Sequence, residues 1–208
     1  MSYRRSRGSS IRFSSRELRD LAAAWLALGV AFTVFFAGGG AALAAPGMFS
    51  RLLLISLLTA GVGFLLHELA HKLVAIRFGQ LAEFRASYPM LAIAIAFAFA
   101  GFIFAAPGAV YHRGHITTRE NGIIALAGPV TNLGLGLLFV PLLFAPGGFL
   151  TDLGRYGVLI NFFLAAFNLI PFGPLDGRKV REWGLGIFVL SFVVSLILLA
   201  GAILILLL

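Results

Sequence analysis

The stretch that decides the fold is LLLISLLTAGVGFLLHELAHKLVAIRF, residues 52–78. A helix rises about 1.5 Å per residue, so about 20 apolar residues are enough to cross the hydrocarbon core of a bilayer. Similar apolar runs recur along the chain, which is 60% hydrophobic and only 12% charged. Soluble domains carry about 25% charged residues, so this composition predicts an integral membrane protein.

The positions of arginine and lysine predict how the chain is threaded. Residues 1–17 form a basic arm, which the positive-inside rule places in the cytoplasm. The expected crossings are residues 18–36, 52–78, 122–145, 155–171 and 184–208. Because the other basic residues gather at the ends of apolar runs, the net charge of +8 indicates topology and not nucleic acid binding. We expect one membrane-embedded domain over residues 18–208, with its metal-binding core at about 52–182.

The segment 90–106 has an ambiguous pattern, because Leu, Ile and Phe alternate with Ala through most of it. Alternation is typical of a strand, but Ala and Leu also favour helices, and the run is long enough to cross. A re-entrant element keeps Arg85 and Arg113 on the cytoplasmic side, whereas a sixth crossing separates them. We therefore expect an all-α polytopic bundle of about five to six transmembrane helices, with a re-entrant hairpin or strand element after the helix at 52–78.

The pattern His-Glu-x-x-His occurs at residues 67–71, inside an apolar run. Histidines four residues apart share one helix face, so His67 and His71 can bind one tetrahedral zinc ion. Glu68 then lies beside a zinc-bound water and can accept its proton as general base. The alternative is a structural trio held by neighbouring helices. Each ionisable group near the bilayer centre costs roughly 2.5–3.5 kcal/mol, which favours the metal site.

A third metal ligand has to come from another span, and Asp176 is the best candidate. The sequence has no cysteine, so the ligand must be His, Asp, Glu or a main-chain oxygen. Asp176 follows an inward-running span, which places it at the same end as His71, and prolines and glycines in 168–177 break the helix there. The alternative is an interfacial aspartate that pairs with Arg178 or Lys179.

Together these motifs resemble the site-2 protease family of intramembrane zinc metalloproteases. That family shows the His-Glu-x-x-His pattern on one helix, and Asn-x-x-Pro followed by Leu-Asp-Gly on another. Here the second helix offers residues 168–171 and 175–177, and the family's Gly-Pro-x-x-Asn element matches residues 128–132. The resemblance implies one Zn²⁺ per chain, bound by His67, His71 and Asp176, with Glu68 as the catalytic base.

The same resemblance implies roles for two asparagines. Asn168 would be catalytic, helping to hold the substrate or the oxyanion, and Asn132 would line the substrate cleft. From the residues alone, both amides could instead form hydrogen bonds between helices. The family also places an edge strand after the motif helix, which could pair with an unwound substrate by strand addition.

The function that these features favour is an intramembrane zinc endopeptidase acting on membrane-protein or transmembrane-peptide substrates. We expect a multi-pass protein in the bilayer of a prokaryotic cell membrane, with its N-terminus in the cytoplasm and its active site nearer the cytoplasmic face. The alternatives are a membrane metal transporter and an inactive protease-like scaffold. A transporter would show ligands along a pathway or inverted repeats, and neither is visible in the sequence. The oligomeric state stays open.

Overall fold

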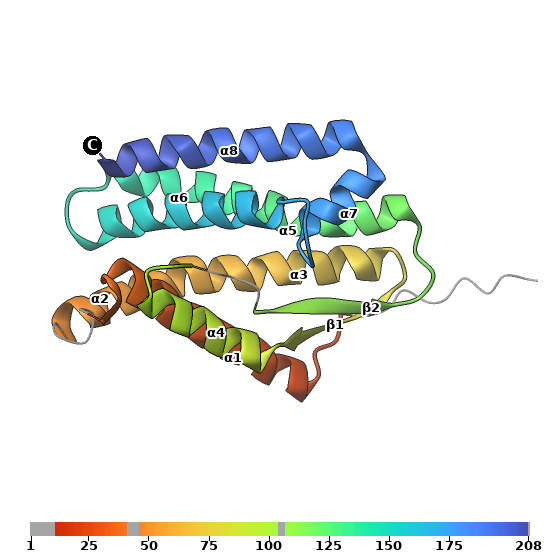
Figure 1. Ribbon diagram of the computed structural model, residues 1–208, viewed down its shortest axis with the longest axis horizontal. Helices are drawn as coiled ribbons and strands as arrows, with labels where there is room; N and C mark the ends of the chain where they lie inside the picture. The colour runs from red at the N-terminus through yellow and green to blue at the C-terminus, as the bar shows by residue number, and fades with distance from the viewer. Residues whose placement is uncertain (1–10, 41–45, 104–106, 208) are drawn as a thin grey trace, which may run out of the picture.

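Five long helices carry the apolar runs of the chain in the computed structural model, which describes residues 11–40, 46–103 and 107–207 (Figure 1). The first is α1 (Ser15–Phe36), and the second is one continuous helix made of α2 (Pro46–Ser56), a π-helical segment (Leu57–Gly61) and α3 (Val62–Arg77). The third is α5 (Thr118–Phe139) with a 3₁₀ extension (Val140–Phe144). The last two are α6 (Phe149–Asn168) and α8 (Leu185–Leu207). Within the described residues, five helices are long and apolar enough to cross a membrane. The predicted all-α, multi-pass architecture is confirmed. Residues 1–10 of the predicted basic arm lie outside the described residues.

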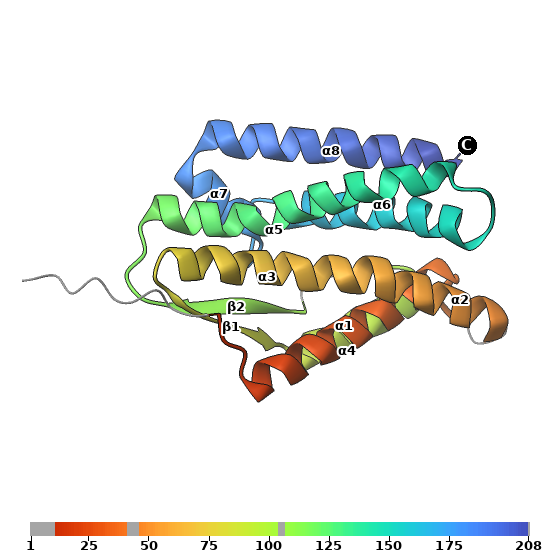
Figure 2. The ribbon, with the colours of Figure 1, turned by 180° about the vertical axis from the view of Figure 1, so that it is seen from behind.

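Helix α3 lies in the middle of the molecule. Figures 1 and 2 show α5, α6, α8 and the short helix α7 (Asp176–Trp183) on one side of α3, with α1 and the strands on the other. Helix α3 packs most extensively against α5, and α5 in turn packs against α6 and α7. The motif at residues 67–71 is therefore enclosed by protein on both sides of α3.

The helix that carries His67 and His71 changes to a π-helical turn at Leu57–Gly61, shortly before these residues. The ring nitrogen of Trp25 in α1 donates a hydrogen bond to the carbonyl oxygen of Leu57 at 3.0 Å. A Cβ atom on Gly61 would collide with the same indole ring. This contact fixes α1 against the motif helix, and π-helical turns of this kind often occur near functional sites.

The alternating segment forms a helix, so its reading as a strand is wrong. Helix α4 covers Tyr88–Phe99, and its 12 residues extend only about 18 Å, too short to cross a bilayer. Its buried residues Leu91, Ala94 and Ala98 follow helical spacing, and Ala98 packs near Val34 of α1. Alanine at every second position gives the segment high helix propensity and lets α4 approach α1 closely.

Two short strands flank α4 and bring its ends together. Strand β1 (Leu81–Ala86) pairs antiparallel with β2 (Gly108–Arg113), so that the last residue of one faces the first residue of the other. The backbone N–H of Ser87 donates to the carbonyl oxygen of Pro107 at 2.8 Å. The chain therefore leaves the sheet at Ala86 and rejoins it at the opposite residue, Gly108, which agrees with the expected hairpin, while its re-entrant position in a membrane stays a prediction.

Candidate active site

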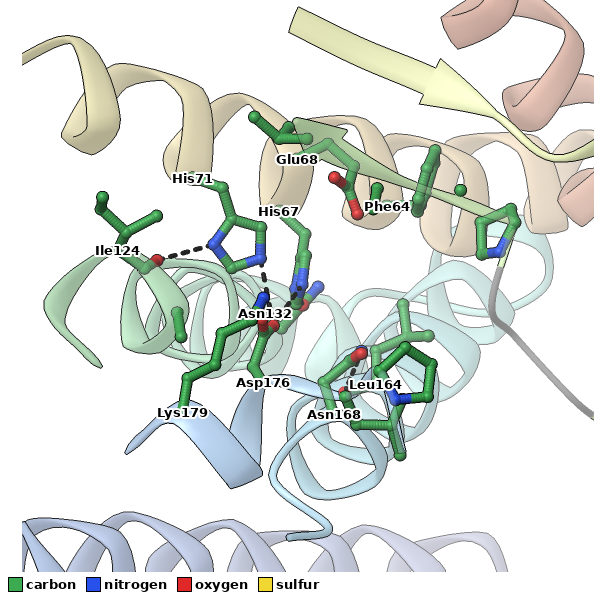
Figure 3. A pocket seen from close by; sticks show the side chains of 17 residues that line it. Phe64, His67, Glu68, His71, Ile124, Asn132, Leu164, Asn168, Asp176 and Lys179 are labelled. Carbon is green, nitrogen blue, oxygen red and sulfur yellow. Dashed lines mark hydrogen bonds and ion pairs between the residues drawn. The ribbon is translucent and has the colours of Figure 1, made fainter. Parts of the chain in front are cut away.

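The three predicted metal ligands converge in one buried group between α3 and α7 (Figure 3). The Oδ2 atom of Asp176 lies 3.3 Å from Nε2 of His67 and 3.1 Å from Nε2 of His71. One candidate ligand atom from each residue lies within 4.8 Å of the other two. Zinc in catalytic sites takes three such protein ligands and keeps its fourth position open.

The charge state of Asp176 suits a metal ligand. Burial by itself raises the pKa of a carboxyl group, whereas protonated imidazoles at His71 and His67, through their charges and hydrogen bonds, hold the pKa of Asp176 below its ordinary value while no metal is bound. Aspartate binds metal ions as the carboxylate, and a bound cation favours that form when the imidazoles are neutral.

Both imidazole rings are oriented by hydrogen bonds at the nitrogen that faces away from Asp176. The Nδ1 atom of His67 donates to Oδ1 of Asn132 at 2.6 Å, and Nδ1 of His71 donates to the carbonyl oxygen of Ile124 at 2.7 Å. Each acceptor is an oxygen, so the proton stays on Nδ1 and the lone pair of Nε2 is free for a metal. Helix α5 thus fixes the tautomers of both histidines on α3.

Asn132 is fully buried and belongs to a chain of amides that links three helices. Its Nδ2 donates to the carbonyl oxygen of Gly63 on α3 at 3.2 Å and to Oδ1 of Asn161 on α6 at 3.0 Å. These bonds turn the Oδ1 atom of Asn132 toward His67. Asn161 was not singled out in the sequence, where its signal is an amide in the middle of an apolar run.

Gly128 leaves open the space in front of the two imidazoles. A Cβ atom at this position would lie 2.5 Å from the Nε2 atoms of both His67 and His71. A side chain here would therefore collide with both candidate ligand nitrogens. The donor set and the space that Gly128 preserves both fit a zinc ion.

The bend between α6 and α7 brings Asp176 to the histidines. Helix α6 ends at Asn168, the turn passes through Gly173 with φ +61°, and α7 begins at Asp176. A Cβ atom on Gly177 would collide with the carbonyl oxygen of Leu169. The Leu-Asp-Gly element therefore needs its glycine so that the start of α7 can dock on the end of α6.

Glu68 faces the same cavity as the three ligands (Figure 3). The cavity measures about 90 Å³, which is room for an ion and several water molecules. Glu68 is 7% exposed, and its Oε2 atom has no hydrogen-bond partner among the described residues. A buried carboxylate oxygen without a partner costs free energy, so Glu68 is placed to bind water or a reacting group.

Two further side chains border the cavity. Asn168 does so with its Nδ2 donating to the carbonyl oxygen of Leu164, 2.9 Å away in its own helix (Figure 3). Lys179, considered from the sequence only as a partner of Asp176, has its Nζ atom 3.7 Å from Oδ1 of that residue. The structure thus brings together every predicted site residue and adds Lys179.

Comparison with known proteins gives named relatives in an archaeon and in bacteria. The candidate zinc metalloprotease MJ0611 of Methanocaldococcus jannaschii is 41% identical over 179 residues, which cover 84% of this chain and 88% of MJ0611. The candidate zinc metalloprotease YwhC of Bacillus subtilis is 34% identical, over 60% of this chain and 66% of YwhC. Rip2 of Mycobacterium tuberculosis, named in the same way, is 32% identical, over 58% of this chain and 53% of Rip2. No family model and no solved structure matches the chain.

Proposed function

Because this chain belongs to the site-2 protease family of zinc metalloproteases, we propose that it is an intramembrane endopeptidase that hydrolyses peptide bonds in or near transmembrane segments of other membrane proteins. One observation carries the proposal. Glu68, with an unpaired carboxylate oxygen, shares a cavity with His67, His71 and Asp176, and α3 belongs to a helix long enough to cross a bilayer.

The side chains around the cavity divide the work of hydrolysis. Zinc held by the two histidines and Asp176 supplies Lewis-acid chemistry, which lowers the pKa of water and polarises a carbonyl group. Glu68 accepts the proton of the attacking water and passes it to the leaving amine. Asn168 donates a hydrogen bond to the developing oxyanion once its amide turns away from Leu164. Lys179 lines the same cavity and adds positive charge there.

Strand β2 offers the substrate a place to bind. In the β1–β2 pair, Phe84 turns its backbone N–H away from β2 and donates it to Glu17 of α1. Val110 lies directly opposite Phe84, so its backbone groups also point away from the partner strand, at the other edge of the pair. Residues 108–110 border the cavity beside Glu68. A helical substrate hides its peptide bonds, and an unwound segment added to this edge as a strand would expose them.

We place the active site near the cytoplasmic face of a prokaryotic cell membrane. The support is the basic N-terminal arm, together with relatives from an archaeon and bacteria. The chain has no cysteine, so single-cysteine variants report position cleanly. Tyr111→Cys should be labelled from the cytoplasm and Phe144→Cys from outside, since both side chains are well exposed. The reverse pattern would overturn this orientation.

The decisive experiment tests Glu68→Gln in the purified chain with a panel of transmembrane peptides. The wild type should cleave at least one peptide and lose this activity with a chelator. The variant should cleave about 10² to 10⁴ times more slowly, because it lacks the proton acceptor. Its zinc content should stay near one ion per chain, because His67, His71 and Asp176 remain.

The matched control is Glu182→Gln, which alters an exposed glutamate paired with Arg178 on α7. Its rate should stay within about twofold of wild type, as for most surface substitutions. Wild-type cleavage by Glu68→Gln would show that Glu68 is not the base. A zinc-loaded wild type that cleaves nothing would favour a transporter or a scaffold. Against a transporter, the described residues hold one group of potential metal ligands and no second group along a path.

A further inference from the structure

Glu17 and Lys72 form a second buried cluster of charges, on the side of α3 that faces α1. Their side chains are 1% and 2% exposed. The ammonium group of Lys72 donates to both carboxylate oxygens of Glu17, at 2.7 and 2.6 Å, and to the carbonyl oxygen of Arg12 at 2.6 Å. All three N–H donors of Lys72 are thereby used, and the pair is held in one geometry.

The same carboxylate also holds the outer edge of β1. The backbone N–H of Phe84 donates to Oε1 of Glu17 at 3.0 Å. Two residues further on, the N–H of Ala86 donates to Oδ2 of Asp20 at 3.3 Å. An exposed strand edge normally leaves such groups free to pair with another chain. Here the carboxylates of α1 close this edge of the sheet.

The two edges of the hairpin therefore differ. Backbone groups of directly opposite residues in an antiparallel pair point either toward each other or both outward. Phe84 points outward to α1, so Val110, its partner in the register, points outward on the cavity side. The contacts that fix β1 on α1 thus also set where β2 lies beside Glu68.

We propose that Glu17 is a positioning residue, which uses Lys72 as its anchor on α3 to hold the substrate-binding edge of β2 at a fixed place beside Glu68. The inference rests on the proposed function and adds to it a residue outside the cavity. Lys72 follows directly after His71 on α3, and lies one helical turn after Glu68. The helical turn that carries the catalytic groups therefore also carries the anchor of the strand.

A purely structural role explains this pair poorly. Replacing a buried ion pair with apolar side chains of similar volume is often neutral or stabilising, so charge is not needed to hold α1 against α3. An apolar pair cannot accept a hydrogen bond from Phe84. The distinctive contribution of Glu17 is this acceptor, rigidly held by Lys72.

Two double variants separate these contributions. Glu17→Gln with Lys72→Met removes both charges but keeps a carbonyl acceptor for Phe84, whereas Glu17→Met with Lys72→Met removes the acceptor as well. The full chain in lipid nanodiscs is analysed for amide hydrogen exchange in both strands, for zinc content, and for kcat and KM with a transmembrane peptide.

The variant without an acceptor should exchange about tenfold faster in residues 81–86 and 108–113, the scale expected for losing about one net hydrogen bond. Its KM should rise about tenfold, while kcat and zinc content stay within about twofold. The glutamine variant should remain near wild type in all four measurements. Glu83→Gln, on the same strand but with its side chain bonded to Ser14, is the matched control and should also match wild type.

Equal behaviour of the two double variants, or wild-type exchange and KM in the variant without an acceptor, would overturn the proposal. Loss of zinc in both double variants would also do so, because it would show that the pair supports the whole fold. The exchange measurement needs no catalysis. If the wild type cleaves no peptide, the proposed function fails, and the exchange difference still decides whether Glu17 positions the hairpin.

Discussion

The two sides of α3 bury charged groups in opposite ways. Toward α1, Lys72 finds three acceptors, and the cluster is complete as it stands. Toward α5 and α7, two imidazole nitrogens converge on Asp176, and Glu68 keeps an unpaired oxygen nearby. Both arrangements cost desolvation, but the second is rich in acceptors, which a cation and water would complete. Burial of charge alone therefore does not identify a site, whereas an incomplete set of partners does.

The immediate surroundings of the two clusters differ in the same way. Gly128 keeps space open at the histidines, where a Cβ atom would meet both Nε2 atoms. At Lys72 the ammonium group already has partners on every side that it uses, because it also sits 3.9 Å from the centre of the Phe13 ring. The metal side keeps room beside nitrogen atoms that still lack a cation, whereas on the α1 side every donor of the Lys72 ammonium group already has an acceptor.

The largest effect is expected for Gly128→Ala, which fills that room. The added methyl group lies within 2.5 Å of both Nε2 atoms, so the chain should bind little or no zinc and lose cleavage. Gly134→Ala is the matched control, because it lies on the same helix and its Cβ would meet nothing within 4 Å. Elemental analysis of both purified variants checks the prediction. A full zinc ion in Gly128→Ala would place the metal elsewhere.

Some of this site follows from sequence, because its cause is local. Two histidines on one helical face can be recognised from their spacing, and the five crossings from hydropathy, since lipid requires long apolar helices. Asp176 could be matched to His71 because charge topology places both near one end of the bundle. These inferences need no knowledge of which helices touch.

Other features depend on contacts between distant segments. The space at Gly128 exists only because α5 packs against α3, and Glu17 meets Lys72 at a sequence separation of 55 residues. The helical form of α4 was hidden by its alternation, since period two and high helix propensity point to different structures. Packing of Ala98 on α1 selects the helix. Local patterns do not contain this information.

Lys72→Met should have the next largest effect, on stability and not on metal binding. It leaves the carboxylate of Glu17 buried without its cation, a change that typically costs about 3–5 kcal/mol. Zinc content of the folded fraction should remain near one ion per chain. Denaturation followed by helix content measures the stability loss. A variant that unfolds normally but has lost its zinc would show that the two clusters are not separate.

Asn132→Leu should weaken zinc binding by about 10- to 100-fold, the usual effect of removing a group that orients a metal-binding histidine. The substitution removes the oxygen that accepts the His67 Nδ1 proton, and it also removes the amide group that donates to Oδ1 of Asn161. Thr131→Val is the control, because its hydroxyl donates to the carbonyl oxygen of Ala127 within the same helix α5. Competition with a chelator measures affinity in both. Unchanged affinity in Asn132→Leu would mean that packing alone orients His67.

The smallest effect is expected for Asp152→Asn, at the end of the bundle opposite the metal ligands. Asp152 pairs with Arg51 at 2.6 Å, but the two side chains are 35% and 47% exposed, and such surface pairs contribute about 0–1 kcal/mol. Zinc content and cleavage should stay within about twofold of wild type. Asp176→Asn makes the same chemical change inside the buried cluster, where losing a ligand charge should release zinc and abolish cleavage. The two variants compare Asp152, whose charge is already balanced by Arg51, with Asp176, which shares its place with two histidines that still lack a cation. Equal zinc loss in both would show that net charge, and not the geometry at His67 and His71, holds the metal.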